Sequence, residues 1–409
     1  MTPASLDGSR WRRLLAALCL ALLAASCGGG GGGDVSRAQA SDSEATQLAR
    51  QLSAGDPQAA QAVAAAQSAQ AAPGAESAQG LFGFGRRIRE VVVFGDSLSD
   101  VGTYQVDGVA AVGGGKFTTN PGWVWAETIG ILLGTRVTPF LRGGFGVAPQ
   151  VLGGTGFAMG GSRISQQPGI GCKPDPATAA CTAALTIPVT QQVSDYLGAH
   201  GDRFDRRQMV FVFAGANDLF FQLGAFAARV NAGMPVQQAQ GLALEAMGQA
   251  GLELAAEVGR IQAHGATRVA VLTVPDIADT IFGNAPEQAP VRPLIAAMVQ
   301  VFNATLTAAL GGNPAKIIDI YALFKDTIAN PGRYGVTELK VPACDAALIA
   351  AVTQGQVTDG SSLFCSPITL VQALAPFTYL FADSVHVTTL GHLNIARFVL
   401  VEMWRQGLF

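Results

Sequence analysis

The sequence has little charge and few of the residue types that bind nucleic acids or metals. Asp, Glu, Lys and Arg make up only 13% of the 409 residues, the formal net charge is −3, and there are four histidines. Nucleic-acid binding needs a clustered basic surface, which this balance of charges does not favour. The six cysteines include no C-x-x-C pair and have no histidine nearby, which argues against zinc. We therefore expect no nucleic-acid partner and no cofactor.

The N-terminal apolar run, residues 14–25, is only twelve residues long and too short to cross a bilayer as a helix. Arginines precede it and small residues lead from it to Cys27, as in an export signal. An ordinary cleaved signal peptide fits this pattern. So does a bacterial lipoprotein signal, which the stretch resembles although Ala24 stands where Leu is usual; it would place a lipid on Cys27, and Gly28 would favour the outer membrane. We expect a signal peptide over 1–26, and an outer-membrane lipoprotein of a Gram-negative bacterium or otherwise a periplasmic or extracellular protein.

Residues 27–85 are a low-complexity stretch of Gly, Ala, Gln and Ser with few large apolar side chains. Such a segment cannot bury enough apolar surface to offset the entropy lost on ordering. We predict a tether over 27–85 and one folded domain over 86–409.

The cysteines of the predicted domain are four in number: Cys172, Cys181, Cys344 and Cys365. An even number in an exported protein suggests two disulfides, and four cysteines allow three pairings. We favour the local pairing, 172 with 181 and 344 with 365, because each pair brackets a loop-like insert. A zinc site is the weaker alternative.

The predicted domain alternates apolar strands with long helical patterns. The apolar runs are at 89–94, 209–213, 267–274 and 316–321, and the helical patterns at 121–134, 235–264, 290–310 and 390–407. Continuous apolar runs are typical of parallel strands covered on both faces. The alternation predicts an α/β layered domain with a parallel sheet, whose ligands lie at the carboxyl ends of the strands.

Two polar clusters directly follow predicted strands. Ser97 lies in the run GDSLSD, where its hydroxyl would stand at the carboxyl edge of the sheet. A nucleophile at that position can also offer its own amide to an oxyanion. Asn217 lies in GAND after the second strand, where its amide can donate to negative charge. For both clusters an ordinary helix cap is the competing interpretation.

A serine nucleophile needs a base, and His386 is the best of the four histidines. It lies in a turn three residues after Asp383, a spacing that allows the carboxylate to orient the imidazole. His200 lies in a charged loop, and His264 ends a helix. His392 lies among apolar neighbours in the last helix, where a core or capping role fits better.

Four ordered blocks make the chain similar to the GDSL or SGNH family of lipases and esterases. They are FGDSLSDVG at 94–102, GGTGFAMGGSRI at 153–164, AGAND at 214–218 and DSVH at 383–386. The resemblance implies a three-layer α/β/α, flavodoxin-like fold with a mainly parallel sheet of about five strands. Gly156 stands where the family often has Asn, and Val387 where it usually has Pro.

The resemblance also implies a role for each matching residue. Ser97 corresponds to the nucleophile, His386 to its base and Asp383 to the acid that orients the base. The oxyanion donors would be the amide of Ser97, the amide of Gly161 and the side chain of Asn217. Because Gly160 adjoins Gly161, the second donor carries a one-residue ambiguity.

These roles predict a carboxylic ester hydrolase, an esterase or lipase, that works through an acyl-enzyme. An acyltransferase with the same intermediate is one alternative, and a non-catalytic surface binding protein on a hydrolase fold is another. We expect an ester or lipid as the substrate and a membrane contact through lipid on Cys27. Several aromatic residues near the blocks fit either an apolar acyl pocket or core packing: Phe140, Phe145, Phe157, Phe220 and Phe221.

Overall fold

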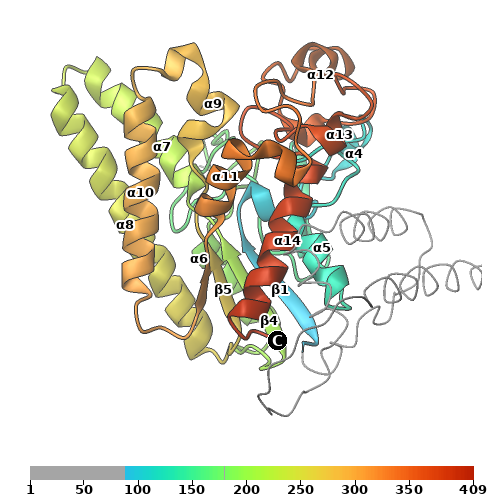
Figure 1. Cartoon of the computed structure of the whole chain (residues 1–409), viewed down its shortest axis with the longest axis vertical. Helices are drawn as coiled ribbons and strands as arrows, with labels where there is room; N and C mark the ends of the chain where they lie inside the picture. The colour runs from blue at the N-terminus through green and yellow to red at the C-terminus, as the bar shows by residue number, and fades with distance from the viewer. Residues whose placement is uncertain (1–87, 179) are drawn as a thin grey trace, which may run out of the picture. The chain divides into compact units, whose positions relative to one another are not determined.

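A computed structural model describes residues 88–178 and 180–409 (Figure 1). The predicted signal peptide, Cys27 and the tether over 27–85 lie outside the described residues. The central sheet has four parallel strands in the order β1, β4, β5, β6. Their bounds are β1 Glu90–Gly95, β4 Gln208–Phe213, β5 Val269–Leu272 and β6 Lys316–Ile318.

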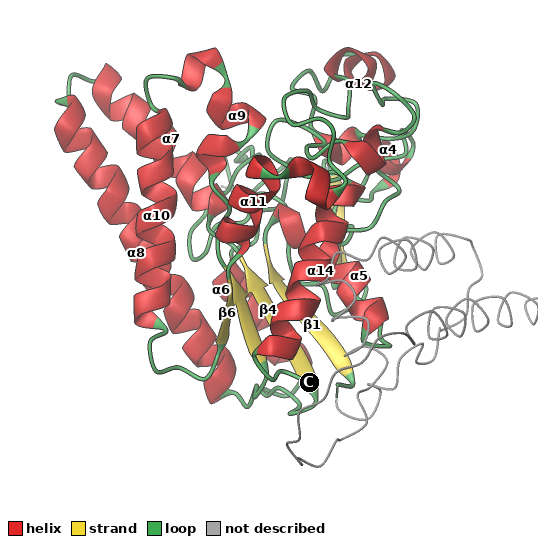
Figure 2. Ribbon diagram, viewed as in Figure 1, coloured by secondary structure: helices red, strands yellow, loops and turns green. Residues whose placement is uncertain are grey.

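Helices cover both faces of this sheet, which explains why its strands are mostly apolar. Figure 2 shows α8 and α10 on one side of the sheet and α5 and α14 on the other. The bounds of the longer helices are α5 Trp125–Leu132, α6 Val189–Ala199, α7 Ala216–Asn231, α8 Val236–Ala263, α10 Arg292–Ala309, α11 Ile320–Ala329 and α14 Thr389–Arg405. The α/β class with a mainly parallel sheet is therefore confirmed.

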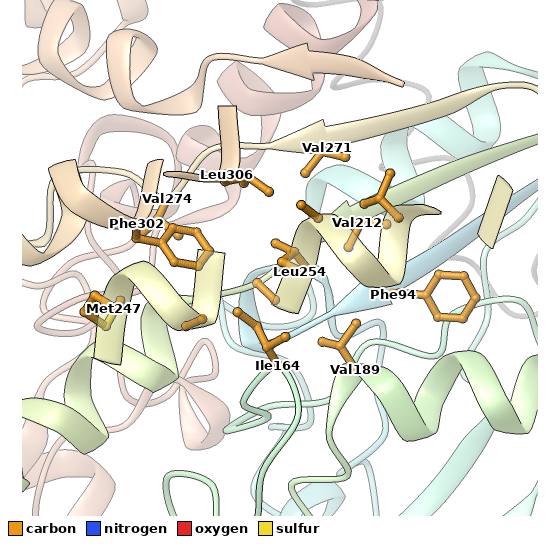
Figure 3. Packing of buried hydrophobic residues seen from close by; sticks show 14 of the residues in the cluster. Phe94, Ile164, Val189, Val212, Met247, Leu254, Val271, Val274, Phe302 and Leu306 are labelled. Atoms are coloured by element: carbon orange, nitrogen blue, oxygen red, sulfur yellow. The ribbon is translucent and has the colours of Figure 1, made fainter. Parts of the chain in front are cut away.

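The two faces of β1 belong to separate hydrophobic clusters. Val91 and Val93 pack with α5 and α14, whereas Val92 and Phe94 pack with the helices of the opposite layer. Figure 3 shows this second cluster, in which the strands supply Phe94, Val212 and Val271 and the helices supply Leu254, Phe302 and Leu306. A fully buried side chain of this size contributes about 1.5–3 kcal/mol through the hydrophobic effect.

The described sheet has four regular strands, where the resemblance implies about five. At the free edge of β1, Gly156 forms an isolated parallel bridge with Val93. The Val93 amide donates to the Thr155 carbonyl at 3.0 Å, and the Phe157 amide donates to the Val93 carbonyl at 2.8 Å. A β-carbon on Gly156 would lie 2.5 Å from Val101 Cγ2. A larger residue here would force Val101 to shift, so glycine suits the close packing, and glycine weakens a regular strand.

Smaller elements surround the carboxyl edge of the sheet. They are a hairpin of β2 Leu141–Gly144 and β3 Val147–Val151, and the short helices α4 Asp107–Ala110, α9 Ile281–Asn284, α12 Ala346–Val352 and α13 Ala375–Thr378. None of the helices within 88–178 and 180–409 has both the length and the apolar character needed to cross a membrane.

Both disulfides form with the local pairing, Cys172 with Cys181 and Cys344 with Cys365. The prediction is confirmed, and the zinc alternative is wrong because a sulfur in a disulfide is not a thiolate ligand.

Candidate active site

The turn that carries Ser97 follows from the close pairing of β1 with β4. Gly95 ends β1 opposite Phe213 and has a φ of +148°, and a β-carbon there would lie 2.0 Å from the Phe213 carbonyl oxygen. Only glycine fits this position. Asp96 then caps a short 3-10 helix, Ser97–Ser99, by accepting a hydrogen bond from the Leu98 amide at 3.2 Å. The hydroxyl of Ser97 is thereby held at the carboxyl edge of the sheet.

The structure brings Ser97, His386 and Asp383 into one hydrogen-bonded line. Ser97 Oγ lies 2.8 Å from His386 Nε2, and His386 Nδ1 lies 2.7 Å from Asp383 Oδ2. Ser97 and Asp383 are buried, and the His386 side chain is 18% exposed. This geometry allows the imidazole to accept the hydroxyl proton while the carboxylate fixes its tautomer.

Backbone amides hold the Asp383 carboxylate in place. Oδ1 accepts from the amides of Val385 at 2.9 Å and His386 at 2.7 Å, and Oδ2 accepts from the Ser362 amide at 2.8 Å. Burial alone would raise the pKa of Asp383, but the charge of His386 and these hydrogen bonds outweigh it and lower the pKa. Asp383 therefore stays ionised beside the imidazole.

The electrostatics of His386 depend on nearby carboxylates. Burial alone would lower the pKa of His386, but the charge and hydrogen bond of Asp383, with a contribution from Asp96, raise it. Burial in turn raises the pKa of Asp96 to about 7. The ring of Phe117 packs on the imidazole with 5.0 Å between centroids. The site thus favours the imidazolium that proton transfer from Ser97 would create.

Asn217 is placed as a donor and does not cap its helix. It lies in the first turn of α7, where Gly215 is the N-cap and no side chain caps the helix. Its Nδ2 donates to the Ser162 carbonyl at 2.9 Å, and its second hydrogen has no acceptor among the described residues. The capping interpretation is therefore wrong for Asn217.

Asp100 distinguishes the backbone amides of the two adjacent glycines, Gly160 and Gly161. The Gly160 amide donates to Asp100 Oδ2 at 2.9 Å, whereas the amides of Gly161 and Ser97 have no acceptor in the described part of the chain. Gly161 has a φ of +80°, and a β-carbon there would lie 2.0 Å from the Ile170 carbonyl oxygen. Gly161 thus offers a free amide at a position that only glycine can occupy.

Several residues that support this geometry escape sequence reasoning. Asp100 is fully buried, and its other oxygen accepts from the amides of Gly102 and Thr103 at 2.9 and 2.8 Å. Ser362 and Phe117 contact the site from distant parts of the chain. Of these three residues, only Asp100 lies in one of the four sequence blocks, the first at 94–102.

The remaining histidines do not join the line of Ser97 and His386. His392 is fully buried and accepts from the Trp125 amide at 3.3 Å through Nδ1. Burial lowers the pKa of His392 to about 3, so it stays neutral, and of the two roles expected for it, core or cap, its full burial fits the core.

Two pairs of aromatic rings near the sequence blocks lie in different surroundings, one at the hydrophobic core and one near the turn of His386. Phe157 belongs to the core, and the partly buried ring of Phe140 stacks on it with 4.2 Å between centroids. Phe220 meets Phe282 at 5.4 Å, and the Phe282 amide donates to the Ser384 carbonyl at 2.9 Å. This half-buried pair thus adjoins both the first turn of α7 and the turn of His386.

The α/β fold and the aligned hydroxyl, imidazole and carboxylate place the chain among the hydrolases. Residues 91–399 match the GDSL-like lipase/acylhydrolase family, and the chain belongs to that family. No group of three or more His, Cys, Asp or Glu side chains suited to a metal ion occurs in the described part of the chain.

Curated relatives at low identity include esterases. The chain is 27% identical over 331 residues to esterase EstA of Pseudomonas aeruginosa and, at the same values, to esterase EstA of Pseudomonas putida; the match covers 75% of this chain and 45% of each relative. It is 28% identical over 349 residues to an uncharacterized protein in the trpE-trpG intergenic region of Pseudomonas putida, covering 78% of this chain and 49% of the relative. The chain thus spans about half the length of these relatives.

A solved acetyl xylan esterase, AlAXEase, matches with a TM-score of 0.32 and 14% identity, covering 77% of this chain and 98% of that one.

Proposed function

We propose that the protein is a carboxylic ester hydrolase that works through an acyl-enzyme on Ser97. The observation that carries the proposal is the unbroken hydrogen-bonded line from Ser97 Oγ through His386 to Asp383. Family membership and the esterase names of two relatives support a hydrolase function.

In the proposed mechanism, His386 takes the proton of Ser97 as Oγ attacks the ester carbonyl. The amides of Ser97 and Gly161 and the side chain of Asn217 donate to the tetrahedral oxyanion. His386 then protonates the leaving alcohol, which leaves an acyl group on Ser97. Water, activated by the same imidazole, releases the acid and restores the hydroxyl. The buried Asp383 carboxylate stabilises the imidazolium in both steps.

The proposal is tested by covalent labelling with a fluorophosphonate, which reacts with an activated serine. The wild-type protein should be labelled on Ser97 and should hydrolyse p-nitrophenyl esters, and Ser97→Ala should lose both properties. Ser99→Ala is a matched control, because Ser99 is buried two residues away and accepts from Trp125 Nε1 at 3.2 Å. A wild-type protein that is neither labelled nor active would favour a binding role instead. Competition by added alcohols during turnover would reveal an acyltransferase.

We also propose that the domain is exported and held at the outer membrane by lipid on Cys27. Support comes from the export-type N-terminus and from the two disulfides, since such bonds persist in oxidising compartments. Ester substrates with apolar acyl groups fit the Phe220–Phe282 pair beside the site.

A further inference from the structure

Gln192, a buried side chain of α6, hydrogen-bonds to the backbone of Gly95, the last residue of β1, just before the turn that carries Ser97. It is 2% exposed, and its Oε1 accepts from the Gly95 amide at 2.9 Å. Its Nε2 donates back to the Gly95 carbonyl at 2.8 Å. The Gly95 carbonyl also accepts from the Met159 amide at 3.1 Å, so Gln192 and the segment after Gly156 together hold the last residue of β1, two positions before Ser97.

The same amide reaches the segment that carries the second oxyanion donor. Nε2 of Gln192 lies 3.3 Å from Ser162 Oγ and 3.0 Å from the Ile187 carbonyl oxygen. Ser162 follows Gly161 directly, and its own carbonyl accepts from Asn217 Nδ2 at 2.9 Å. One hydrogen-bonded network therefore connects the segments of all the donors assigned above: the turn of Ser97, the loop of Gly161 and the side chain of Asn217.

We propose that Gln192 is a positioning residue that sets the spacing of the oxyanion donors. This inference rests on the proposed ester hydrolysis. Oxyanion donors act by being held in place before charge develops, and a displacement of about 1 Å can cost roughly 10²-fold in rate. Gln192 touches none of the reacting atoms, so it acts through Gly95 and Ser162. An amide is needed because the position must accept from one backbone N–H and donate to oxygens at the same time.

The test is Gln192→Met, which keeps the length of the side chain and removes its hydrogen bonds. We expect kcat for a p-nitrophenyl ester to fall by about 10–10²-fold with KM within about twofold. The acid limb of the pH profile should stay in place, because His386 and Asp383 are untouched. Combined with Asn217→Ala, the loss should be smaller than the product of the single losses, since both changes act on the same donors.

Asn303 of α10 provides a matched control. Like Gln192 with Gly95, it both accepts from and donates to the backbone of one residue, Val274, which lies just after β5. Its Oδ1 accepts from the Val274 amide at 2.9 Å and its Nδ2 donates to the Val274 carbonyl at 2.8 Å. Asn303→Leu should lower the melting temperature and leave the kcat of the folded enzyme unchanged. Ser162→Ala removes only the hydroxyl end of the Gln192 network and should show the kcat effect at smaller size, even where Gln192→Met folds poorly.

A melting temperature lowered by Gln192→Met or Ser162→Ala with wild-type kcat would overturn the inference. So would fully multiplicative losses in the double variant. Failure of the proposed function has a different signature, because a Ser97→Ala protein that keeps its activity would contradict ester hydrolysis at Ser97 whatever the behaviour of Gln192.

Discussion

Replacing Asn217 by Ala should separate a catalytic role from a structural one. The side chain is 6% exposed and donates one hydrogen to the Ser162 carbonyl, which leaves the other for the oxyanion. Loss of one oxyanion donor lowers kcat by about 10²–10³, equivalent to roughly 2.7–4 kcal/mol in the transition state. The Ser162 carbonyl also loses its partner, which costs about 1–3 kcal/mol of folding free energy. No capping loss is added, because the side chain does not cap α7.

The catalytic and the folding effect are measured on one sample. kcat and KM are determined with a p-nitrophenyl ester, and the melting temperature by calorimetry. We expect kcat to fall with KM nearly unchanged, because the donor acts on charge that exists only in the transition state. Asn394→Ala is the matched control: Asn394 is similarly buried and donates to the Tyr334 carbonyl at 3.0 Å. It should lower the melting temperature and keep kcat. If Asn217→Ala behaves like Asn394→Ala, the assignment of Asn217 to the oxyanion hole is refuted.

The remaining predictions concern titration, a disulfide, anchoring and acyl length. Because the charge of Asp383 raises the pKa of His386, Asp383→Asn should lower that pKa; an NMR titration of the imidazole with no downward shift would contradict the stated cause. Replacing Cys344 and Cys365 by Ser should lower the free energy of unfolding by about 3 kcal/mol, since the bond joins residues 21 apart, and an unchanged denaturation midpoint would argue against this. Cys27→Ser should release the protein into the soluble fraction or block its processing, and unchanged membrane association would mean that another feature holds it. A series of p-nitrophenyl esters should show acyl chains longer than acetyl being accepted; strict preference for acetyl groups on sugars would exclude this.

The sheet is readable from the sequence because parallel strands covered on both faces are continuous apolar runs. Each predicted strand overlaps an observed one, as 209–213 overlaps β4, although the predicted strand 316–321 runs past the end of β6 at Ile318 into α11. The start of helix α7 cannot be recognised in the same way, because its first turn contains Asn217 and Asp218, residue types that also favour caps and turns. The β2–β3 hairpin lacks an apolar pattern toward the core, since β3 is exposed along its length.

The candidate active site can be predicted only in part from the sequence, for a different reason. Ser97, Asn217 and His386 stand in short local patterns that reveal both residue type and place. The choice of Gly161 over Gly160 requires the partner of the Gly160 amide, which is Asp100, 60 positions away in the chain. Gln192 has no pattern of its own, because its role lies in contacts that exist only after α6 packs beside β1.

Ser97 and His386 are 289 positions apart in the chain, so they are made at different times during synthesis. At about 5–20 residues per second, the ribosome makes the serine roughly 15–60 s before it makes the imidazole. The carboxylate that fixes the imidazole arrives only three residues ahead of it, and α14, which packs behind both, comes last. Until the C-terminal segment has been made and has docked, the nascent chain therefore lacks the imidazole and the carboxylate that align with the Ser97 hydroxyl in the finished fold.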